Sequence, residues 1–517
     1  MEMSGAVSRI QSESPGVTDG RHRSFQSIQD RLFWIIYLLA LVVSVSIWFS
    51  TIRAPLWLDE TISFWQINAG FSQILSRQGG LSFPAYSYIL WLATVVLGKS
   101  EIALRIPSIL AMLGAVYLLY RAARELFDRE SAIIVAIVFC LHPIVMFASI
   151  DVRPYAFGAL AINAAIYALV RLRHNDSSWW AVLFGFSAAC IVYFHFLFVV
   201  VLLPLAIGFF AVKAGDRKTV WRQGSIAIAA FTLAFLPVIP GLQYMFRTSG
   251  IHVFSEAPSL RTLILTLAPQ PLTLVVGIVT VLAIAAMWRP GMQQPVESWR
   301  TVLCVSLALV PLLILFAVSV GTSIHIFVDR YRLAAIPGIA LCWGLVASKI
   351  DSRALRLLSC VAIVVTSISQ YVVSPSFGHH RYTWKYALEF AEKNASPDDA
   401  PVLMCSDLPE ADYIVMPISS VKDNPYFSPL AYYKLSVPVV PLPRALNDEA
   451  KRVTSQFLEE ATQRQERFLA IAFEPSYDIL DWIADRAAPT HNVRILGVFD
   501  RVKVLEFTPR AQAAFTH

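Results

Sequence analysis

Long apolar stretches recur along most of this chain, and they restrict its fold more than any other feature. A membrane-spanning helix needs about 17–25 predominantly apolar residues. By that criterion we find about eleven stretches, at residues 32–50, 104–122, 131–149, 154–172, 178–195, 196–213, 224–246, 262–288, 301–320, 332–348 and 357–374. Only 15% of the residues are charged and the mean hydropathy is +0.58. The sequence therefore predicts a polytopic α-helical membrane protein.

The positions of Arg and Lys predict which ends of the spans face the cytoplasm. One further apolar stretch, residues 83–98, is short and contains Pro84 near its start. If it crossed the membrane, the Arg-rich loop 121–129 would face outward, against the preference of basic residues for cytoplasmic loops. We therefore assign it to an outer loop, 51–103, that contains interfacial helices. This topology predicts a cytoplasmic N-terminus and a C-terminus on the outer face.

Composition changes at both ends of the apolar region, 32–375, which we interpret as the transmembrane domain. Residues 1–31 are polar and rich in Ser and Gln, as is typical of a disordered cytoplasmic tail. Beyond residue 375, acidic residues occur at ordinary density and no stretch is long enough to span. Helix-like runs there alternate with strand-like runs such as 400–405 and 468–473. The sequence predicts a small α/β domain on the outer face over residues 376–517.

Two adjacent carboxylates, Asp59 and Glu60, follow the first span in a segment rich in aromatic residues. Charged groups at membrane depth are costly, so they indicate a functional site by default. A carboxylate at this boundary can act as a general base on an acceptor hydroxyl or amine. The alternative is an acidic cap on an interfacial helix, because carboxylates stabilise a helix N-terminus.

The predicted topology brings more polar side chains to the same face. Asp151, Arg153 and Tyr155 follow the third span, and Arg330 and Tyr331 lie at the start of the tenth. A guanidinium group is a planar fork that matches phosphate oxygens. The alternatives are an Asp–Arg pair at a helix start with Pro in its first turn, and arginines that reach water beside a tyrosine belt.

Arg105 and His195 also fall at outer boundaries. Arg105 could hold a phosphate in the same way, whereas His195 is interpreted first as a hydrogen-bonded structural residue and second as a substrate contact. Carboxylates, arginines and aromatic side chains at lipid depth suit a lipid-phosphate substrate. The sequence has no Gly-rich phosphate loop, which disfavours a nucleotide-sugar donor or ATP. The net charge of +6 lies mostly in short loops and indicates topology rather than nucleic-acid binding.

Several motifs, over about residues 32–350, resemble the polyprenyl-phosphate-sugar-dependent glycosyltransferases of the GT-C fold. The resemblance is to the families of bacterial aminoarabinose transferase and protein O-mannosyltransferase. It is carried by Trp57–Glu60, Phe83–Tyr86, Ser100–Ser108, His142–Pro143, Ser149–Ala156, Tyr193–His195, Arg330–Tyr331 and Pro337. The resemblance implies that Asp59 is the catalytic base and that Asp151 and Arg153 belong to a second outer loop of the active site.

Together with what this resemblance implies, the sequence predicts an inverting glycosyltransferase of the bacterial inner membrane. It would move a monosaccharide from a polyprenyl-phosphate donor to a periplasmic acceptor, which could be a lipid-linked glycan, lipid A or a protein. No cofactor is required, although a divalent metal is compatible with this chemistry. The catalytic candidates are Asp59, Glu60 and Asp151, and the candidates for binding the donor or its phosphate are Arg153, Tyr155, Arg330, Tyr331, Arg105 and His195.

Two other functions remain open at this point. A flippase or transporter for a lipid-linked sugar would show charges at mid-membrane and repeated halves. Here the charges lie at one face and no repeat is apparent. A membrane acyltransferase would place a His inside a span near an acid, and His142 in the third span fits that requirement.

Overall fold

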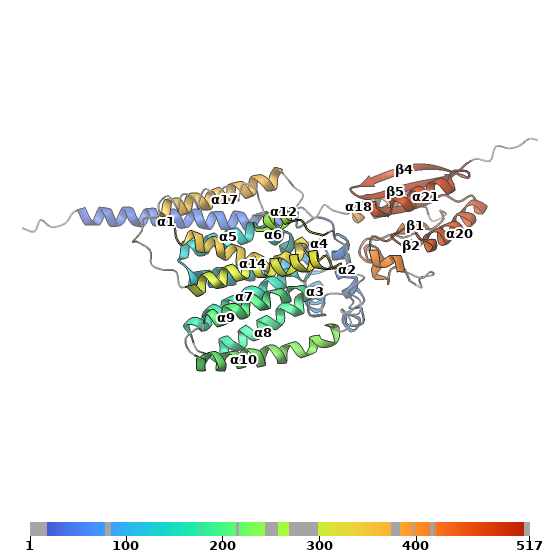
Figure 1. Cartoon of the computed structure of the whole chain (residues 1–517). Coiled ribbons are helices and arrows are strands. Elements are labelled where there is room, and N and C mark those ends of the chain that lie inside the picture. The colour runs from blue at the N-terminus through green and yellow to red at the C-terminus, as the bar shows by residue number, and fades with distance from the viewer. Residues whose placement is uncertain are drawn as a thin grey trace, which may run out of the picture.

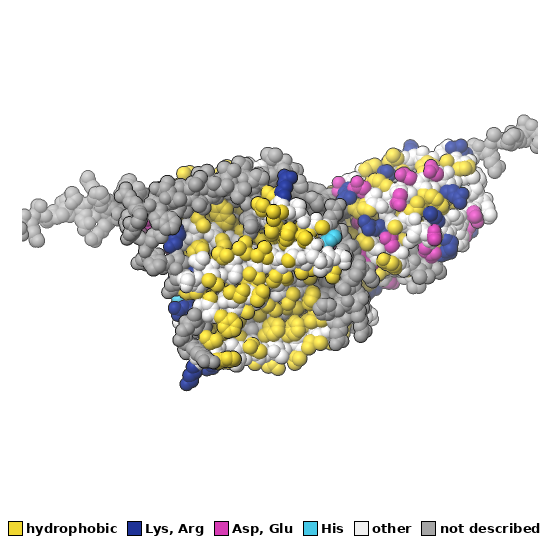
Figure 2. Space-filling view, in the orientation of Figure 1, with side chains coloured by type: hydrophobic (Ala, Val, Ile, Leu, Met, Phe, Trp, Pro, Cys, Tyr) yellow, Lys and Arg dark blue, Asp and Glu magenta, His cyan; other side chains and the backbone are white. Residues whose placement is uncertain are grey.

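The computed structural model describes residues 18–77, 84–175, 177–212, 217–242, 257–267, 298–373, 383–396, 399–413, 418 and 420–510. The chain forms a bundle of apolar helices with a small mixed sheet at one end (Figure 1). The surface seen in Figure 2 is largely hydrophobic over the helices, and it carries both signs of charge over the C-terminal part. The predicted class, a polytopic helical membrane protein with a small C-terminal α/β part, is confirmed.

The bundle contains helices of very different length. Five described helical stretches are long and apolar enough to cross a membrane, and a sixth candidate is the pair α5 and α6, which bends by 67°. The helices are α1 (Thr18–Ser46), α4 (Glu101–Leu126), α5 (Arg129–Leu141), α6 (Pro143–Ile150), α7 (Tyr155–His174), α8 (Ser178–Phe194), α9 (Leu202–Val212), α10 (Arg217–Phe235), α12 (Leu260–Leu267), α14 (Ser298–Gly321), α15 (Asp329–Arg332), α16 (Ile336–Ala347) and α17 (Arg353–Val373). Most of the predicted span 262–288 lies outside the described residues, so the count of eleven stays a prediction.

Helix α1 begins earlier than the sequence suggested. Residues 18–31 were assigned to a disordered tail, but they continue the first spanning helix toward the N-terminus. No proline interrupts this segment. Once a helix has nucleated in the apolar span, adding further residues costs little, because each one forms its own hydrogen bond. The rest of the predicted tail, 1–17, lies outside the described residues.

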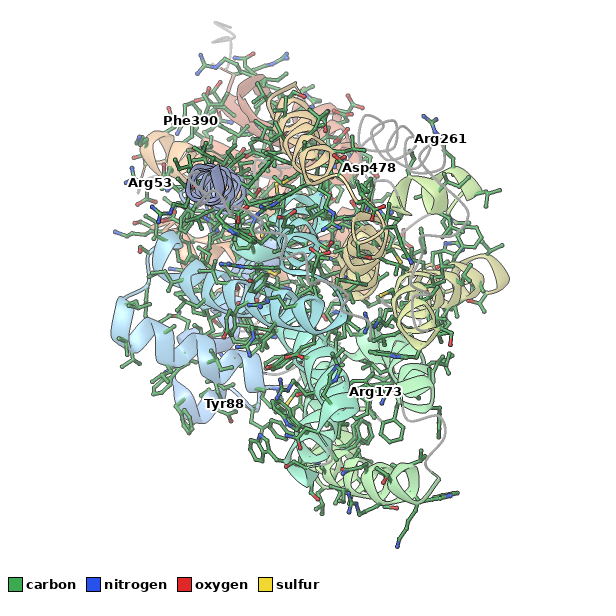
Figure 3. All side chains as sticks on the ribbon, turned by 90° about the vertical axis from the view of Figure 1, so that its left-hand side faces the viewer. Arg53, Tyr88, Arg173, Arg261, Phe390 and Asp478 are labelled. Carbon is green, nitrogen blue, oxygen red and sulfur yellow. The ribbon has the colours of Figure 1, made fainter. Side chains whose placement is uncertain are left out.

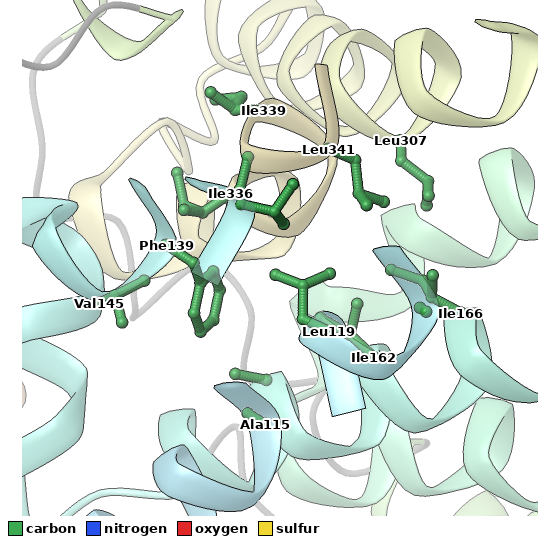
Figure 4. Close-up of a cluster of buried hydrophobic side chains, with 14 of the residues drawn as sticks. Ala115, Leu119, Phe139, Val145, Ile162, Ile166, Leu307, Ile336, Ile339 and Leu341 are labelled. Carbon is green, nitrogen blue, oxygen red and sulfur yellow. The ribbon is translucent and has the colours of Figure 1, made fainter. Parts of the chain in front are cut away.

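Side chains from five helices fill the centre of the bundle. Figure 4 shows part of this core, with Leu119 of α4, Phe139 of α5, Ile162 of α7, Leu307 of α14 and Ile336 of α16. All five are buried. Burial of a large apolar side chain stabilises the fold by about 1.5–3 kcal/mol, although between membrane helices much of that gain comes from close packing.

The first outer loop holds helices that do not span, as the topology argument required. They are α2 (Leu58–Asn68), η2 (Phe71–Gln73) and α3 (Pro84–Leu97), whereas η1 (Ile47–Thr51) belongs to the first spanning stretch before them. Helix α3 has 14 residues, so its length is roughly 21 Å, against a hydrocarbon thickness of about 30 Å. In the view of Figure 3, Tyr88 of α3 lies at the edge of the molecule.

The C-terminal part is a five-stranded sheet of order β2-β1-β3-β5-β4 with helices packed on it. Strand β1 is parallel to β2 and β3, whereas β5 is antiparallel to β3 and β4. The strands are β1 (Val402–Cys405), β2 (Val439–Leu442), β3 (Phe468–Phe473), β4 (His491–Phe499) and β5 (Val502–Pro509), and the helices are α18 (Trp384–Asn394), α19 (Pro429–Tyr432), α20 (Asp448–Arg464) and α21 (Tyr477–Ala487). The predicted domain boundary near residue 375 lies outside the described residues.

The sheet part is anchored on helix α2. The Tyr433 hydroxyl accepts a hydrogen bond from the Leu56 backbone N–H at 2.7 Å, and the hydroxyls of Thr61 and Ser428 are 2.9 Å apart. Two ion pairs of 2.8 Å join the sheet part to neighbouring segments: Arg77, after η2, binds Asp423, and Glu101, at the start of α4, binds Lys385. Helix α2 therefore lies between the bundle and the sheet.

The two ends of the bundle differ in charge. At the end away from the sheet, basic side chains bind acids or a helix carbonyl: Arg171 with Glu125, Arg300 with the carbonyl of Leu126, Arg353 with Glu130, and Arg356 with Asp128. The candidate site residues, which the sequence placed at the outer ends of the spans, lie at the opposite end of the bundle, next to the sheet. Successive helices thus alternate in direction in the way the positive-inside argument requires. Which end faces the cytoplasm stays a prediction.

Candidate active site

Asp59 and Glu60 are neighbours in sequence but point to different parts of the molecule. Helix α2 begins at Leu58, with Trp57 in extended conformation before it. Successive side chains of a helix with 3.6 residues per turn point about 100° apart. One carboxylate can therefore face the site while the other faces the protein interior.

Glu60 faces the interior, where it is fully buried. Its carboxylate accepts hydrogen bonds from the Arg105 guanidinium at 2.9 Å and from the backbone N–H groups of Val152 and Trp57 at 3.0 and 3.1 Å. These partners belong to three separate segments. Glu60 thus joins the start of α2 to α4 and to the loop before α7, a geometry that fits the helix cap that the sequence left as the alternative.

Arg105 is also fully buried, and its hydrogen-bonding capacity is used up. A guanidinium group has five N–H donors, and Arg105 makes five hydrogen bonds. The acceptors are the carbonyls of Ile150, Ile52, Ala54 and Pro55 and the carboxylate of Glu60. No donor is left for a phosphate. The donor-binding role predicted for Arg105 would require it to give up at least one of these hydrogen bonds.

Asp59 forms the centre of a second, more open cluster. Its carboxylate accepts a hydrogen bond from Arg330 at 2.8 Å, and the two side chains are 16% and 27% exposed. Arg153 approaches from the other side and donates to the Asp59 carbonyl at 3.3 Å and to the Ser63 hydroxyl at 3.4 Å. The structure therefore brings together one carboxylate and two guanidinium groups. All three residues were site candidates from the sequence, and they come from segments far apart in the chain.

Asp151 lies beneath this cluster and is fully buried. Its Oδ1 accepts a hydrogen bond from the Trp57 indole at 3.0 Å, while Oδ2 has no partner among the described residues. Burial raises the pKa of Asp151 well above its ordinary value, and the negative charge of Glu60 adds to the shift. Its protonated form is favoured, which disfavours Asp151 as a base at neutral pH.

Aromatic side chains form one wall of the site. The ring centre of His195 lies 5.3 Å from that of Tyr155 and 5.0 Å from that of Tyr331. The Arg330 guanidinium lies 5.3 Å from the Tyr331 ring centre. The Nδ1 atom of His195 accepts a hydrogen bond from the Leu197 backbone N–H at 3.3 Å, at the start of helix η3 (Phe196–Val201). His195 thus supports the wall, in line with its first interpretation.

One acidic residue near this cluster was not among the sequence candidates. Asp407, two residues after the end of β1, is 9% exposed. Burial raises the pKa of Asp407 to about 7, and the charge of Asp59 contributes in the same direction, which places the two groups within electrostatic reach. An acid at the carboxyl end of a predicted strand was the available signal, because ligands of open α/β sheets bind at such ends.

His142 has a structural role within the described residues. Its Nδ1 accepts a hydrogen bond from the Ile144 backbone N–H at 3.2 Å, which caps α6 where the broken helix restarts. This contact gives no support to the acyltransferase alternative. Over the same residues, no three His, Cys, Asp or Glu side chains gather closely enough to hold a metal ion. The compatibility with a divalent metal stays a prediction.

Comparisons with known proteins agree with this architecture. Residues 82–244 match a family model described as dolichyl-phosphate-mannose-protein mannosyltransferase. The crystal structure of ArnT from Cupriavidus metallidurans bound to undecaprenyl phosphate is similar, with a TM-score of 0.55, 12% identity, and coverage of 92% of this chain and 98% of ArnT. The apo form of ArnT gives a TM-score of 0.54, 12% identity and coverage of 92% and 97%.

A third similar structure is the apo form of the Archaeoglobus fulgidus oligosaccharyltransferase, with a TM-score of 0.49 and 11% identity. The match covers 92% of this chain and 75% of that one. No curated protein sequence matches the chain closely enough to count as a relative. The likeness to ArnT extends over nearly the whole length of both chains, and it confirms the predicted fold class: the protein has the GT-C fold.

Proposed function

We propose that the protein is an inverting glycosyltransferase that uses a polyprenyl-phosphate sugar as donor. The observation that carries the proposal is the contact of Asp59 with Arg330, with Arg153 beside it, at the end of the bundle next to the sheet. This arrangement supplies a base and two phosphate-binding groups at one point. The likeness to ArnT, whose structure contains undecaprenyl phosphate, supports a lipid-phosphate donor.

In this proposal, Arg330 and Arg153 hold the phosphate of the donor. Each guanidinium can donate two parallel hydrogen bonds to phosphate oxygens. The Nε atoms of both residues are buried and have no partner among the described residues, so each retains an unused donor. Tyr155, Tyr331 and His195 would line the donor side, and the polyprenyl chain would lie against the lipid-facing helices.

The transfer step follows from these positions. Asp59 accepts the proton of the acceptor nucleophile, whose oxygen or nitrogen attacks the anomeric carbon from the face opposite the phosphate. The bond from the anomeric carbon to the phosphate oxygen breaks, and its electron pair leaves with the lipid phosphate. The two guanidinium groups stabilise the charge that develops on this leaving group, and the configuration at the anomeric carbon inverts.

The ion pair between Asp59 and Arg330 suggests how the donor prepares the base. Without donor, Arg330 is hydrogen-bonded to the Asp59 carboxylate and occupies it. A bound phosphate would compete for the Arg330 guanidinium and release the carboxylate toward the acceptor. The donor would thus activate Asp59 by taking over its partner.

We further propose that the protein lies in a bacterial inner membrane with its N-terminus in the cytoplasm and the site on the periplasmic side. The basic residues gathered at the other end of the bundle support this orientation. The acceptor would then be a lipid-linked glycan, lipid A or a protein at the periplasmic face.

Mass spectrometry of the cell envelope tests the proposed function. Membrane glycolipids and membrane proteins would be compared between cells with and without the protein, and the loss of one sugar residue from one product is expected. Purified protein should also bind undecaprenyl phosphate in detergent. Unchanged envelope products, together with no binding of undecaprenyl phosphate, would contradict the proposal.

A further inference from the structure

The carboxyl edge of the C-terminal sheet holds Asp407, which is within electrostatic reach of Asp59 at the start of α2. Strands β1 and β2 are parallel and adjacent, so the residues that follow them lie at the same edge of the sheet. Asp407 follows β1 and Arg444 follows β2. In open α/β sheets, ligands bind outside the carboxyl ends of the strands. This edge of the sheet is therefore the part of the C-terminal region most suited to binding, and it lies on the side of Asp59.

Asp407 is held in place but keeps hydrogen-bonding capacity. Its Oδ2 accepts a long hydrogen bond from the Trp384 indole at 3.5 Å. The charged groups that act on it are Arg444, Asp59 and Arg501. The two arginines stabilise its ionised form, and burial and Asp59 oppose it. A carboxylate has about four acceptor positions, and one long contact does not fill them.

Arg444 is a half-buried guanidinium beside this acid, and its Nε has no hydrogen-bond partner within the described part of the chain. The turn 409–413 packs next to it, because the Asp412 carboxylate accepts a hydrogen bond from the Ala445 backbone N–H at 2.6 Å. Tyr413, at the end of that turn, is 79% exposed. An acceptor and a donor thus share the carboxyl edge of the sheet, and the exposed aromatic ring ends the turn that is hydrogen-bonded next to Arg444.

We propose that Asp407, Arg444 and Tyr413 form the acceptor subsite, and that the acceptor is a sugar of a glycan. This inference rests on the proposed function and adds the class of acceptor to it. A sugar hydroxyl both donates and accepts hydrogen bonds, so a carboxylate next to a guanidinium satisfies it in both directions. The apolar face of a sugar ring can pack on the exposed tyrosine ring.

A peptide acceptor fits this edge less well. Extended peptides commonly bind by adding a strand to an exposed sheet edge through main-chain hydrogen bonds. Strand β2 is the edge strand nearest Arg444, and its third residue is Pro441, with Pro438 and Pro443 on either side of the strand. Proline has no N–H to donate. Main-chain pairing along this edge is therefore interrupted, which favours recognition by side chains.

The test uses the full-length protein and three variants, Asp407→Asn, Arg444→Gln and Tyr413→Ala, in cells that lack the native copy. The product is measured by mass spectrometry of the glycolipid and membrane-protein fractions. We expect the sugar product in the glycolipid fraction to fall by about tenfold or more in the first two variants, the size expected from losing a hydrogen bond to a charged group. Tyr413→Ala removes an exposed side chain, so its effect cannot be attributed to unfolding.

Arg464→Gln is the matched control, because Arg464 is exposed at the far end of α20. It should leave the product unchanged. Each purified variant should also bind undecaprenyl phosphate as the native protein does, because the donor groups are untouched. Failure of the native protein to bind this lipid would contradict the proposed function, whereas loss of binding in the variants alone would contradict the subsite.

Two further outcomes would overturn the inference while leaving the proposed function intact. One is a product found on membrane protein rather than on a glycan. The other is an unchanged glycolipid product in all three variants. A pH profile gives a separate readout, because the ionised Asp407 accepts hydrogen bonds from hydroxyls. With a pKa of about 7, the apparent acceptor affinity should fall as the pH drops below 7, and Asp407→Asn should remove that dependence.

Discussion

Three consecutive side chains at the start of α2 have three different partners. Asp59 binds Arg330, Glu60 binds Arg105, and Thr61 contacts a hydroxyl of the C-terminal part. The helix separates them by about 100° per residue. One turn of helix therefore fixes the candidate base relative to the site, the bundle and the sheet, and substitutions at the three positions should have different consequences.

Asp59→Asn should abolish most of the transfer and leave the fold intact. Asparagine keeps the size and polarity of the side chain but cannot accept the acceptor's proton. A general base contributes about 10²–10⁴-fold in rate, and turnover should fall by about that factor. Sugar transfer would be measured in membranes with matched protein levels. Near-normal transfer would remove the base assignment, and loss of membrane insertion would instead indicate a structural cap.

Glu60→Gln should act on stability rather than on chemistry. It leaves the fully buried Arg105 without its counter-charge, and removal of one partner of a buried ion pair typically costs about 3–5 kcal/mol. Glu125→Gln is the control, because its pair with Arg171 is partly exposed and should be worth less than about 1 kcal/mol. Melting temperatures in detergent would be compared. Equal melting temperatures for the two variants would contradict the role assigned to Glu60.

Arg330→Lys should weaken use of the donor although it keeps the positive charge. Lysine cannot offer a planar pair of donors to two phosphate oxygens. The apparent KM for the lipid-phosphate donor should therefore rise, by about tenfold for each 1.4 kcal/mol of binding lost. The measurement is a donor titration at saturating acceptor. If Arg330→Ala transfers normally at limiting donor, Arg330 does not hold the phosphate.

The sequence identified the polar residues at this end of the bundle as candidates. It did not distinguish the side chains that face the site from those that face the protein interior. Asp59 and Glu60 have the same chemistry and adjacent positions, so only the direction of each side chain distinguishes them. Arg105 and Arg330 both lie at predicted outer boundaries. They differ because backbone carbonyls accept hydrogen bonds from Arg105. These carbonyls belong to segments distant in sequence, and their positions beside Arg105 could not be predicted.

At the scale of elements, the length and the apolar pattern of a segment predicted its secondary structure. Elements whose sequence departs from the usual pattern were missed. Strand β3 was predicted with its observed bounds, Phe468–Phe473. Strand β2 was missed because Pro441 lies within it, and a proline ordinarily argues against a strand. It is tolerated here because β2 is the edge of the sheet.

Helices α14 and α16 pack so closely at Gly338 that a larger side chain there should destabilise the bundle. A Cβ atom on Gly338 would lie 2.2 Å from the backbone carbonyl carbon of Leu307, so Gly338→Ala should force the two helices apart. Gly321, at the end of α14, has open space around it, and Gly321→Ala is the matched control. Overpacking of this kind costs about 1–3 kcal/mol or more. Thermal unfolding in detergent should show a lower melting temperature for the first variant alone.

At the scale of the whole molecule, the charge difference between the two ends of the bundle determines the orientation we expect. Basic side chains at one end are bound to acids at helix starts, as in Arg356–Asp128. The site and the sheet lie at the other end. The sequence predicted this separation because the loops alternate in charge. The contact between the sheet and α2 could not be predicted from the sequence, because it depends on single hydroxyls such as those of Thr61 and Ser428.

Cysteine labelling in spheroplasts tests the orientation. Arg124→Cys introduces a thiol at an exposed position at the basic end of the bundle, and Lys422→Cys introduces one at an exposed position on the sheet side. An impermeant thiol reagent added from outside should label position 422 and not position 124. The native cysteines in the described residues are buried or half-buried, and the unsubstituted protein measures their background.

Permeabilised spheroplasts are the control, in which both positions should react. Labelling of position 124 in intact spheroplasts would reverse the orientation, because the loop 121–129 would then face outward. Asp59 would in that case lie on the cytoplasmic side. A periplasmic acceptor could no longer reach it, whereas the geometry of the site itself would be unaffected.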